Sequence, residues 1–354
     1  MRQWRKGHIL ATADITVRGA GIFGLSIAWT LMQRGARVQV IDPHGPAAGA
    51  SGGIVGALAP HVPENWNPKK QFQLESLLMA RAFWAEVQDI GGLSPGYARL
   101  GRIQPVSDAA GLALAQARAT SANSLWGDAA RWHVRRSEPT EWTVPSPSGY
   151  EIFDTLSARI HPKQACLSLV AALQARGVPI LTDGTDQGAI VHATGVDGLH
   201  RLNAQRSRVV GSPIKGQAAL LGYAMPGGPQ LFADTLHIIP HADGTTAIGS
   251  TTERAFSTNT GTDAQLDEII KRARAAVPAL SDAPVIARWA GLRPRSRSRA
   301  PMLGRWPDRS GHYIANGGFK IGFGMAPKVA QTMADLVMDN INTIPDGFDV
   351  PSSF

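Results

Sequence analysis

Three glycines and one aspartate near the start of the chain have the types and spacing of a dinucleotide-binding turn. Gly19, Gly21 and Gly24 form a G-x-G-x-x-G pattern between a predicted strand and a predicted helix, and Asp42 ends the next predicted strand. The first glycine permits a tight turn, the second lets the backbone approach a pyrophosphate, and the third allows close packing of helix on strand. The helix N-terminus attracts the pyrophosphate, and Asp42 would accept hydrogen bonds from ribose hydroxyls. The pattern predicts a dinucleotide but does not distinguish FAD from NAD.

The elements that must position these glycines form a βαβ unit. Apolar periodicity predicts a strand over 15–18, a helix over 22–34 and a second strand over 36–41. Similar patterns recur in the middle and at the end of the chain, and two β-rich stretches interrupt them. The sequence therefore predicts a mixed α/β fold, with a Rossmann-like cofactor domain built from discontinuous segments and a β-rich substrate-binding domain. The expected ranges are 14–66, 160–212 and 300–345 for the cofactor domain, 67–159 and 213–299 for the substrate-binding domain, and 1–13 for a basic leader.

Composition narrows the class of protein. The chain has 354 residues and a formal net charge of +8, which favours anionic partners such as a phosphate-bearing cofactor or a small acid. The basic residues are scattered, so nucleic acid is not required as a partner. The sequence has no long uncharged apolar run and no apolar segment after the basic leader, so neither a membrane span nor a secretory signal is expected. Cys166 is the only cysteine, which fits a reducing cytoplasm. No metal-ligand spacing occurs.

The segment after Asp42 favours a flavin over a nicotinamide. It reads DPHGPAAGASGGIVGALAPH, and a loop of small residues lets the backbone approach both a diphosphate and a flat ring. This segment resembles the FAD-dependent D-amino-acid oxidase superfamily, especially glycine oxidases of the thiamin pathway and related sarcosine and D-amino-acid oxidases and dehydrogenases. Further pieces follow in the order of that family: HPKQACLSLVAALQARGV, the ATG turn, PIKGQ, WAGLRPRSRSRAPMLGRWPD and ANGGFKIGFGMAPKVAQTMADLV. The resemblance covers most of the chain and implies FAD, without a residue for covalent attachment.

The resemblance also implies which residues contact FAD. Besides the glycine turn, these residues lie in the small-residue loop, at the ATG turn and before the last helix. The proline at position 327 predicts that this helix starts near Met325, and the N–H groups of its first turn would face the reduced ring. The expected contacts are Gly19, Ala20, Gly21, Ile22, Phe23, Gly24, Asp42, Pro43, His44, Ala50, Ser51, Gly52, Ala57, Leu58, Thr194, Gly195, Arg293, Gly317, Gly318, Phe319, Lys320, Ile321, Gly322, Phe323, Gly324 and Met325. The sequence suggests no role for Arg18. The short link DGTDQG, where the family inserts a β-meander, predicts a more open adenine end.

Four further residues are expected at the substrate end. Arg293 in GLRP matches the carboxylate-binding arginine of the family, and its planar guanidinium can hold an α-carboxylate through two hydrogen bonds. His237 stands where glycine oxidases carry a tyrosine, and it either faces the substrate or is simply packed. Thr252, beyond the same hairpin, is expected to line the pocket. His61 matches a family position near the ring, with an ordinary loop histidine as the alternative.

These residues imply oxidation of a small amino acid such as glycine, sarcosine or a D-amino acid. Its carboxylate would bind Arg293, hydride would pass from Cα to FAD N5, and the resulting imine would hydrolyse. One alternative is oxidation of a carboxymethylaminomethyl group on tRNA wobble uridine, and another is a non-catalytic FAD-binding protein. The sequence leaves open the amine, the choice of O2 or another electron acceptor, the pathway and whether the protein forms a homo-oligomer.

Overall fold

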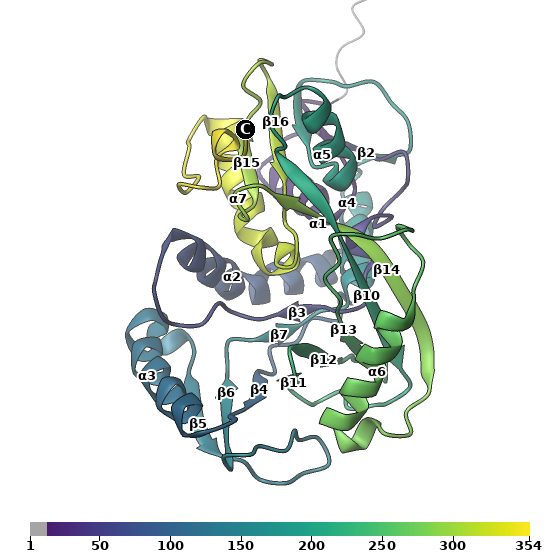
Figure 1. Ribbon diagram of the computed structural model, residues 1–354. Coiled ribbons are helices and arrows are strands. Elements are labelled where there is room, and N and C mark those ends of the chain that lie inside the picture. Colours follow the sequence, from purple (N-terminus) through teal and green to yellow (C-terminus); the bar gives the residue numbers. More distant parts are fainter. Residues whose placement is uncertain (1–12) are drawn as a thin grey trace, which may run out of the picture.

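Two large β-sheets, joined by long strands and by packed helices, make up the protein. A computed structural model describes residues 13–354, and nearly all of the predicted basic leader lies outside them. In Figure 1 the smaller sheet and its helices occupy the upper half, and the larger sheet occupies the lower half. The predicted fold class, a mixed α/β protein with one sheet of the nucleotide-binding type and a second β-rich part, is confirmed.

The smaller sheet has six strands in the order β15-β16-β9-β1-β2-β8. Its strands are parallel except β15, which pairs antiparallel with β16. Nearly all residues of β1 and β2 are buried, including the polar Thr16 and Gln39, which reflects burial of both sheet faces. The bounds are β1 Ile15–Arg18, β2 Val38–Ile41, β8 Ile180–Leu181, β9 Ala189–His192, β15 Met302–Arg305 and β16 His312–Asn316.

The larger sheet has eight strands in the order β14-β10-β13-β12-β11-β4-β6-β5. All neighbours are antiparallel except β11 and β4. The bounds are β4 Arg102–Pro105, β5 Trp132–Arg136, β6 Tyr150–Asp154, β10 Gly211–Leu221, β11 Gln230–Ala233, β12 Leu236–Pro240, β13 Thr246–Gly249 and β14 Val285–Ser296. A short two-stranded sheet pairs β3 (Ala57–Leu58) with β7 (Ala158–Arg159). The long strands β10 and β14 run from the lower half toward the upper half in Figure 1.

Packed helices connect the two halves, although the larger sheet and α6 (Ala264–Ala276) also have an apolar cluster of their own. The bounds of the other helices are α1 Ile22–Gln33, α2 Pro68–Gly91, α3 Ala109–Trp126, α4 Pro162–Ala175, α5 Gly195–Ala204 and α7 Gly322–Asp339. Helix α1 packs against α4 and α7, and α2 packs against the same two helices. One apolar cluster therefore joins residues of the six-stranded sheet with α2, α3 and β6. No helix within residues 13–354 is long and apolar enough to cross a bilayer.

Capping side chains mark the starts of two helices. Asn67 caps α2 and accepts a hydrogen bond from Lys70 N at 3.1 Å, and Asp263 caps α6 in the same way. The last helix is different, because α7 begins at Gly322 rather than near Met325, and Pro327 lies inside it. The N–H groups that the first turn leaves unpaired are therefore those around Gly322.

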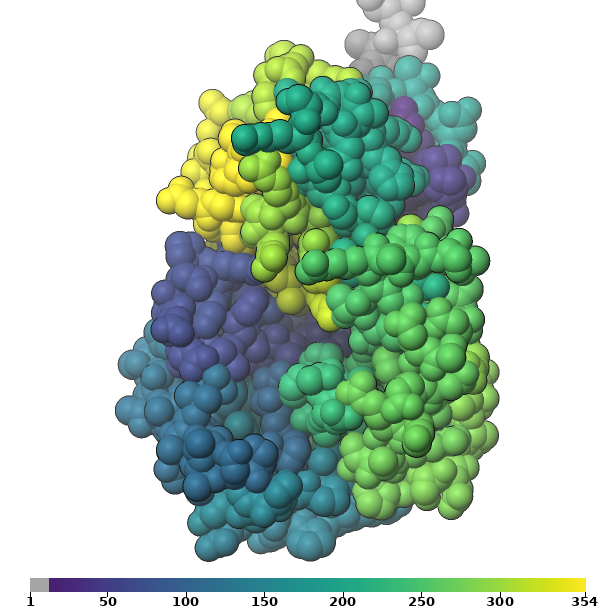
Figure 2. Space-filling view, in the orientation of Figure 1, coloured from purple at the N-terminus to yellow at the C-terminus, as the bar shows by residue number. Residues whose placement is uncertain are grey.

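The predicted domain ranges stay a proposal. The six-stranded sheet takes its strands from 14–66, 160–212 and 300–345, and the eight-stranded sheet takes its strands from the other two ranges, although β10 begins at Gly211. Helix α2, which we assigned to the substrate-binding domain, packs mainly against helices of the cofactor side. Segments from the beginning, middle and end of the chain meet on the face shown in Figure 2.

Candidate active site

A cavity of about 870 Å³ is lined by segments of both sheets. This volume is near the upper end of the range for small-molecule and cofactor sites. One part of the cavity lies at the carboxyl ends of the parallel strands β1, β2 and β9, where open α/β sheets bind nucleotides. The other part lies against β10, β12 and β14 of the larger sheet. The cavity therefore connects a nucleotide-type site with a second, β-lined chamber.

Two glycines of the turn at the first part of the cavity, Gly19 and Gly24, leave no room for a side chain. A β-carbon at Gly19 would lie 2.3 Å from Ala193 O, and one at Gly24 would lie 1.9 Å from Gly19 O. A β-carbon at Gly21 would lie 3.1 Å from Ser51 Oγ, and Gly21 itself lines the cavity. Ser51 Oγ also accepts the Ile22 N–H at 3.0 Å, which ties the small-residue loop to the first turn of α1. The backbone is thus open to a diphosphate at the helix N-terminus, so these residues fit a dinucleotide.

Asp42 occupies the position expected of a ribose-binding carboxylate. It follows β2, lines the cavity and accepts hydrogen bonds from Ala20 N at 2.8 Å and His44 N at 2.9 Å. These bonds fix the carboxylate at the end of the strand. His44 and Asp197 also line the cavity, with 3.4 Å between Nε2 and Oδ2. This part of the cavity has the polar lining that an adenosine moiety needs.

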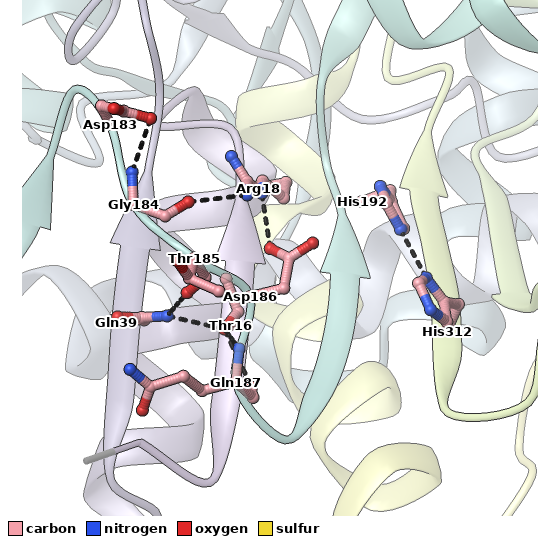
Figure 3. A network of polar contacts seen from close by, with 10 residues as sticks. All are labelled: Thr16, Arg18, Gln39, Asp183, Gly184, Thr185, Asp186, Gln187, His192 and His312. Atoms are coloured by element: carbon pink, nitrogen blue, oxygen red, sulfur yellow. Dashed lines mark hydrogen bonds and ion pairs between the residues drawn. The ribbon is translucent and has the colours of Figure 1, made fainter. Parts of the chain in front are cut away.

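Arg18, for which the sequence suggested no role, forms hydrogen bonds with the short link DGTDQG between β8 and β9. Its Nε donates to Asp186 Oδ1 at 2.6 Å and its Nη2 donates to Gly184 O at 3.0 Å (Figure 3). Gln39 Nε2 donates to Thr185 O at 2.8 Å on the same face. Arg18 therefore holds the short link DGTDQG in place by hydrogen bonds. Arg18 also lines the cavity, so the link lies at the edge of the expected adenine site.

The middle of the cavity has a flat, glycine-rich lining. On one side lie Ala50, Ser51 and the following small residues of the loop that ends at β3. The ring of Trp289 lies close to Gly53 and Gly291, where a β-carbon would be 3.5 Å and 2.5 Å away. On another side α7 begins at Gly322, so its N-terminal N–H groups and partial positive charge face the cavity. Such a lining suits a planar ring that accumulates negative charge.

Arg293 is a partly buried cation on the wall of the second chamber. Its Nη2 donates to Ser250 Oγ at 2.7 Å and its Nη1 donates to Thr251 O at 3.2 Å, so its partners among the described residues are neutral oxygens. Burial lowers the pKa of Arg293 to about 10, and the nearby charge of Glu253 opposes this shift. The guanidinium still carries its charge at neutral pH. It is available to bind an anionic ligand through a two-pronged hydrogen bond.

His237 and Lys320 line the same chamber. The ring of His237 packs at 4.8 Å from the ring of Phe232, and its Nδ1 has no hydrogen-bond partner within residues 13–354. Burial, together with the charges of Arg102 and Lys320, lowers the pKa of His237 to about 3. The imidazole is therefore neutral at working pH. Lys320 is an exposed residue that lines the cavity. Partial desolvation is the larger cause that lowers the pKa of Lys320, and the positive charge of Arg293 lowers it further.

The cavity lining contains most of the predicted site residues. These are Gly19, Gly21, Ile22, Phe23, Asp42, Pro43, His44, Ala50, Ser51, Ala57, Thr194, Gly195, His237, Arg293, Gly317, Gly318, Phe319, Lys320, Gly322, Phe323 and Gly324. Those outside the lining are Ala20, Gly24, Gly52, Leu58, His61, Thr252, Ile321 and Met325.

Two of the four predicted substrate-end residues therefore lie away from the cavity wall. His61 contacts Gln73 of α2 instead, through its N–H at 2.7 Å and through its ring Nδ1. Thr252 accepts a hydrogen bond from Lys320 Nζ at 2.7 Å. Ser250, which holds Arg293, was missed in the sequence analysis, because no local pattern connects it to a residue so far along the chain.

Similarity to a known protein family identifies the fold and the cofactor of the chain. The family of FAD-dependent oxidoreductases that includes D-amino-acid oxidases matches residues 14–336. The chain belongs to this family. FAD is therefore the cofactor of the oxidoreductase, as the glycine cradle and the flat lining predict, and the resemblance noted in the sequence is confirmed.

The relatives of this oxidoreductase include proteins named for glycine oxidation. The bifunctional protein ThiO/ThiG of Synechocystis is 27% identical over 93% of the chain and 52% of its own length. The chain thus spans about half the length of the first curated relatives it matches. The glycine oxidase of Pseudomonas aeruginosa is 34% identical over 35% of each chain. A crystal structure of glycine oxidase from Geobacillus kaustophilus superposes with a TM-score of 0.82 and 21% identity, covering 96% of this chain and 98% of the other.

Proposed function

We propose that this oxidoreductase oxidises the C–N bond of a small amino acid, such as glycine, sarcosine or a D-amino acid, to an imine that water hydrolyses to a 2-oxo acid. The observation that carries the proposal is Arg293, a cation on the wall of the cavity whose hydrogen-bond acceptors among residues 13–354 are neutral oxygens. A guanidinium in that position binds an α-carboxylate and leaves the adjacent Cα–H directed into the cavity.

The other residues of the chamber fit the same reaction. Bound FAD supplies the hydride acceptor. His237 is neutral and its Nδ1 is free of partners within the described chain, so it does not repel a substrate amine and can share a hydrogen bond with it. The N-terminus of α7 at the cavity wall would supply positive potential to a flavin ring bound there and so favour negative charge on that ring. No strong base is required beyond loss of one proton from the ammonium group.

The test is anaerobic addition of glycine, sarcosine and several D-amino acids to the purified yellow protein. We expect at least one of them to bleach the absorption of the bound flavin, and admission of O2 or of an artificial acceptor to restore it. Acid release of the flavin without proteolysis would support the proposal that FAD is held non-covalently. A holoprotein that no candidate amine bleaches would favour the alternative of a non-catalytic FAD-binding protein.

A further inference from the structure

Two cationic side chains face the substrate chamber, and three consecutive residues hold both of them. Ser250 Oγ and Thr251 O accept hydrogen bonds from the guanidinium of Arg293 at 2.7 Å and 3.2 Å. Thr252 Oγ1 accepts one from Lys320 Nζ at 2.7 Å. Both Arg293 and Lys320 line the cavity. The backbone from Ser250 to Thr252 spans at most about 7 Å, and the charge of Arg293 acts on Lys320 and lowers its pKa, so the two cations lie in the same part of the cavity.

The chamber supplies no carboxylate for these two cations. Among the described residues that line the cavity, the acidic ones are Asp42 and Asp197, which belong to the glycine-turn end of the cavity. Glu253 lies near Arg293 but is not among the residues that line the cavity; its Oε1 accepts a hydrogen bond from Gln217 Nε2 at 3.0 Å, and its Oε2 lies 3.7 Å from Lys215 Nζ in a buried ion pair. The two cations of the chamber therefore face a ligand volume without a protein anion in it.

A substrate with a single carboxylate satisfies only one of the two cations. Its carboxylate would bind Arg293, and Lys320 would keep a neutral hydroxyl as its partner while a second positive charge stays nearby. Partly desolvated cations gain most from an ionised oxygen acceptor, and two like charges close together repel each other unless an anion lies between or beside them. A ligand with two acidic groups would satisfy both cations at once.

We propose that the preferred substrate is an amino acid that carries a second acidic group, an aminodicarboxylate, with one carboxylate on Arg293 and the other on Lys320. This inference rests on the proposed function and adds the substrate class to it. The second carboxylate is located either on the side chain of the amino acid or on a substituent of its nitrogen. Lys320 is then a specificity-determining residue at the mouth of the chamber.

Inhibitor binding to the holoprotein tests this proposal without turnover. The probes are acetate, with one carboxylate, and succinate, with two, and their dissociation constants are read from the change each causes in the absorption of bound flavin. We expect succinate to bind the unaltered protein at least tenfold more tightly than acetate. Lys320→Gln should abolish this preference while changing the affinity for acetate less than threefold. The matched control is Lys271→Gln, which removes an exposed lysine on α6. This variant should still bind succinate more tightly than acetate.

The following outcomes would overturn the proposal. One is equal affinity of the unaltered protein for the two anions, and another is an equal loss of affinity for both in Lys320→Gln, which would mean that the ammonium acts on FAD. If Lys320→Gln fails to retain FAD, Lys320→Met takes its place, and an unchanged succinate preference in that variant contradicts the assignment. Bleaching of the flavin by monocarboxylic amino acids without a preference for succinate would refute this inference alone. Absence of bleaching by every amino acid would refute the proposed function with it.

Discussion

The guanidinium of Arg293 lies against the α-carbon of Gly216 so closely that a β-carbon at position 216 would come within 2.0 Å of Nη1. Gly216 on β10 pairs with Gly291 on β14, and Arg293 pairs with Ile214. The arginine side chain therefore leans diagonally across the sheet over a neighbour that has no side chain. The glycine of the PIKGQ stretch is therefore the floor of the proposed carboxylate site.

Gly216→Ala should displace the arginine without removing it. Because the added methyl group overlaps all three terminal atoms of the guanidinium, we expect an increase of about tenfold or more in the apparent substrate constant, with FAD content retained. Steady-state kinetics with the best amine substrate give the measurement. Gly227→Ala is the control, because nothing lies within 4 Å of a β-carbon there. Equal kinetics of the two variants would show that the arginine has room to move aside.

Arg293→Lys should impair substrate binding while leaving the cofactor in place. A lysine keeps the charge but cannot make the two parallel hydrogen bonds of a guanidinium. Hydrogen bonds to charged groups contribute about 1.5–3 kcal/mol, which corresponds to a loss of roughly 10- to 100-fold in substrate affinity. Flavin absorbance per protein reports the cofactor, and kinetics report the substrate. Unchanged kinetics would remove Arg293 from the proposed role.

Two glycines of the turn should respond differently to alanine. In Gly24→Ala the new β-carbon meets backbone, Gly19 O at 1.9 Å, so we expect the apoprotein itself to lose stability by about 1–3 kcal/mol. In Gly21→Ala it meets only the Ser51 hydroxyl at 3.1 Å, so the apoprotein should remain stable but bind FAD more weakly. Denaturant unfolding of both apoproteins and fluorescence titration with FAD separate the two effects. A normal FAD affinity in Gly21→Ala would contradict the close approach of the pyrophosphate.

Buried histidines should make the protein sensitive to acid. Burial lowers the pKa of His237 to about 3 and that of His241 to about 4, below the unfolded value near 6.5. The unfolded chain therefore binds protons that the folded chain does not, and stability falls as pH drops from about 6.5 toward these values. Each such histidine contributes a slope of at most about 1.4 kcal/mol per pH unit. Denaturant unfolding between pH 7 and 5 should show a shallower slope in His237→Gln than in the unaltered protein.

Local patterns predict the cofactor half well. The strand, glycine turn and helix at 15–34 are set by neighbours in the sequence. In the ranges assigned to the substrate-binding domain, Asn67 and Asp263 mark helix starts in the same local way, because their side chains accept hydrogen bonds from nearby N–H groups. The start of α7 is the exception. A proline is common at the first position of a helix, yet here Pro327 sits inside α7, and glycines rather than a capping side chain begin it.

The substrate end could be predicted only in part, because its geometry depends on contacts between distant segments. Arg293 is found through its motif, but its partner Ser250 and the facing Lys320 come from other parts of the chain. His61 is an example of the reverse case. Its position in the sequence suggests a place near the ring, but it does not line the cavity and is hydrogen-bonded to Gln73 of α2 instead. Tertiary packing decides which of several possible partners a side chain contacts, and the spacing of residues in the sequence does not predict that packing.

The packing of α2 on α4 and α7 has a consequence for how substrate enters. Because the six-stranded sheet shares one apolar cluster with α2 and with strands β5 and β6 of the larger sheet, separating these parts would expose that cluster to water. Hinge opening is therefore an expensive route to the flavin. We expect molecules to enter the cavity without it, past the exposed cation Lys320, so ionic strength should govern how fast an anion arrives.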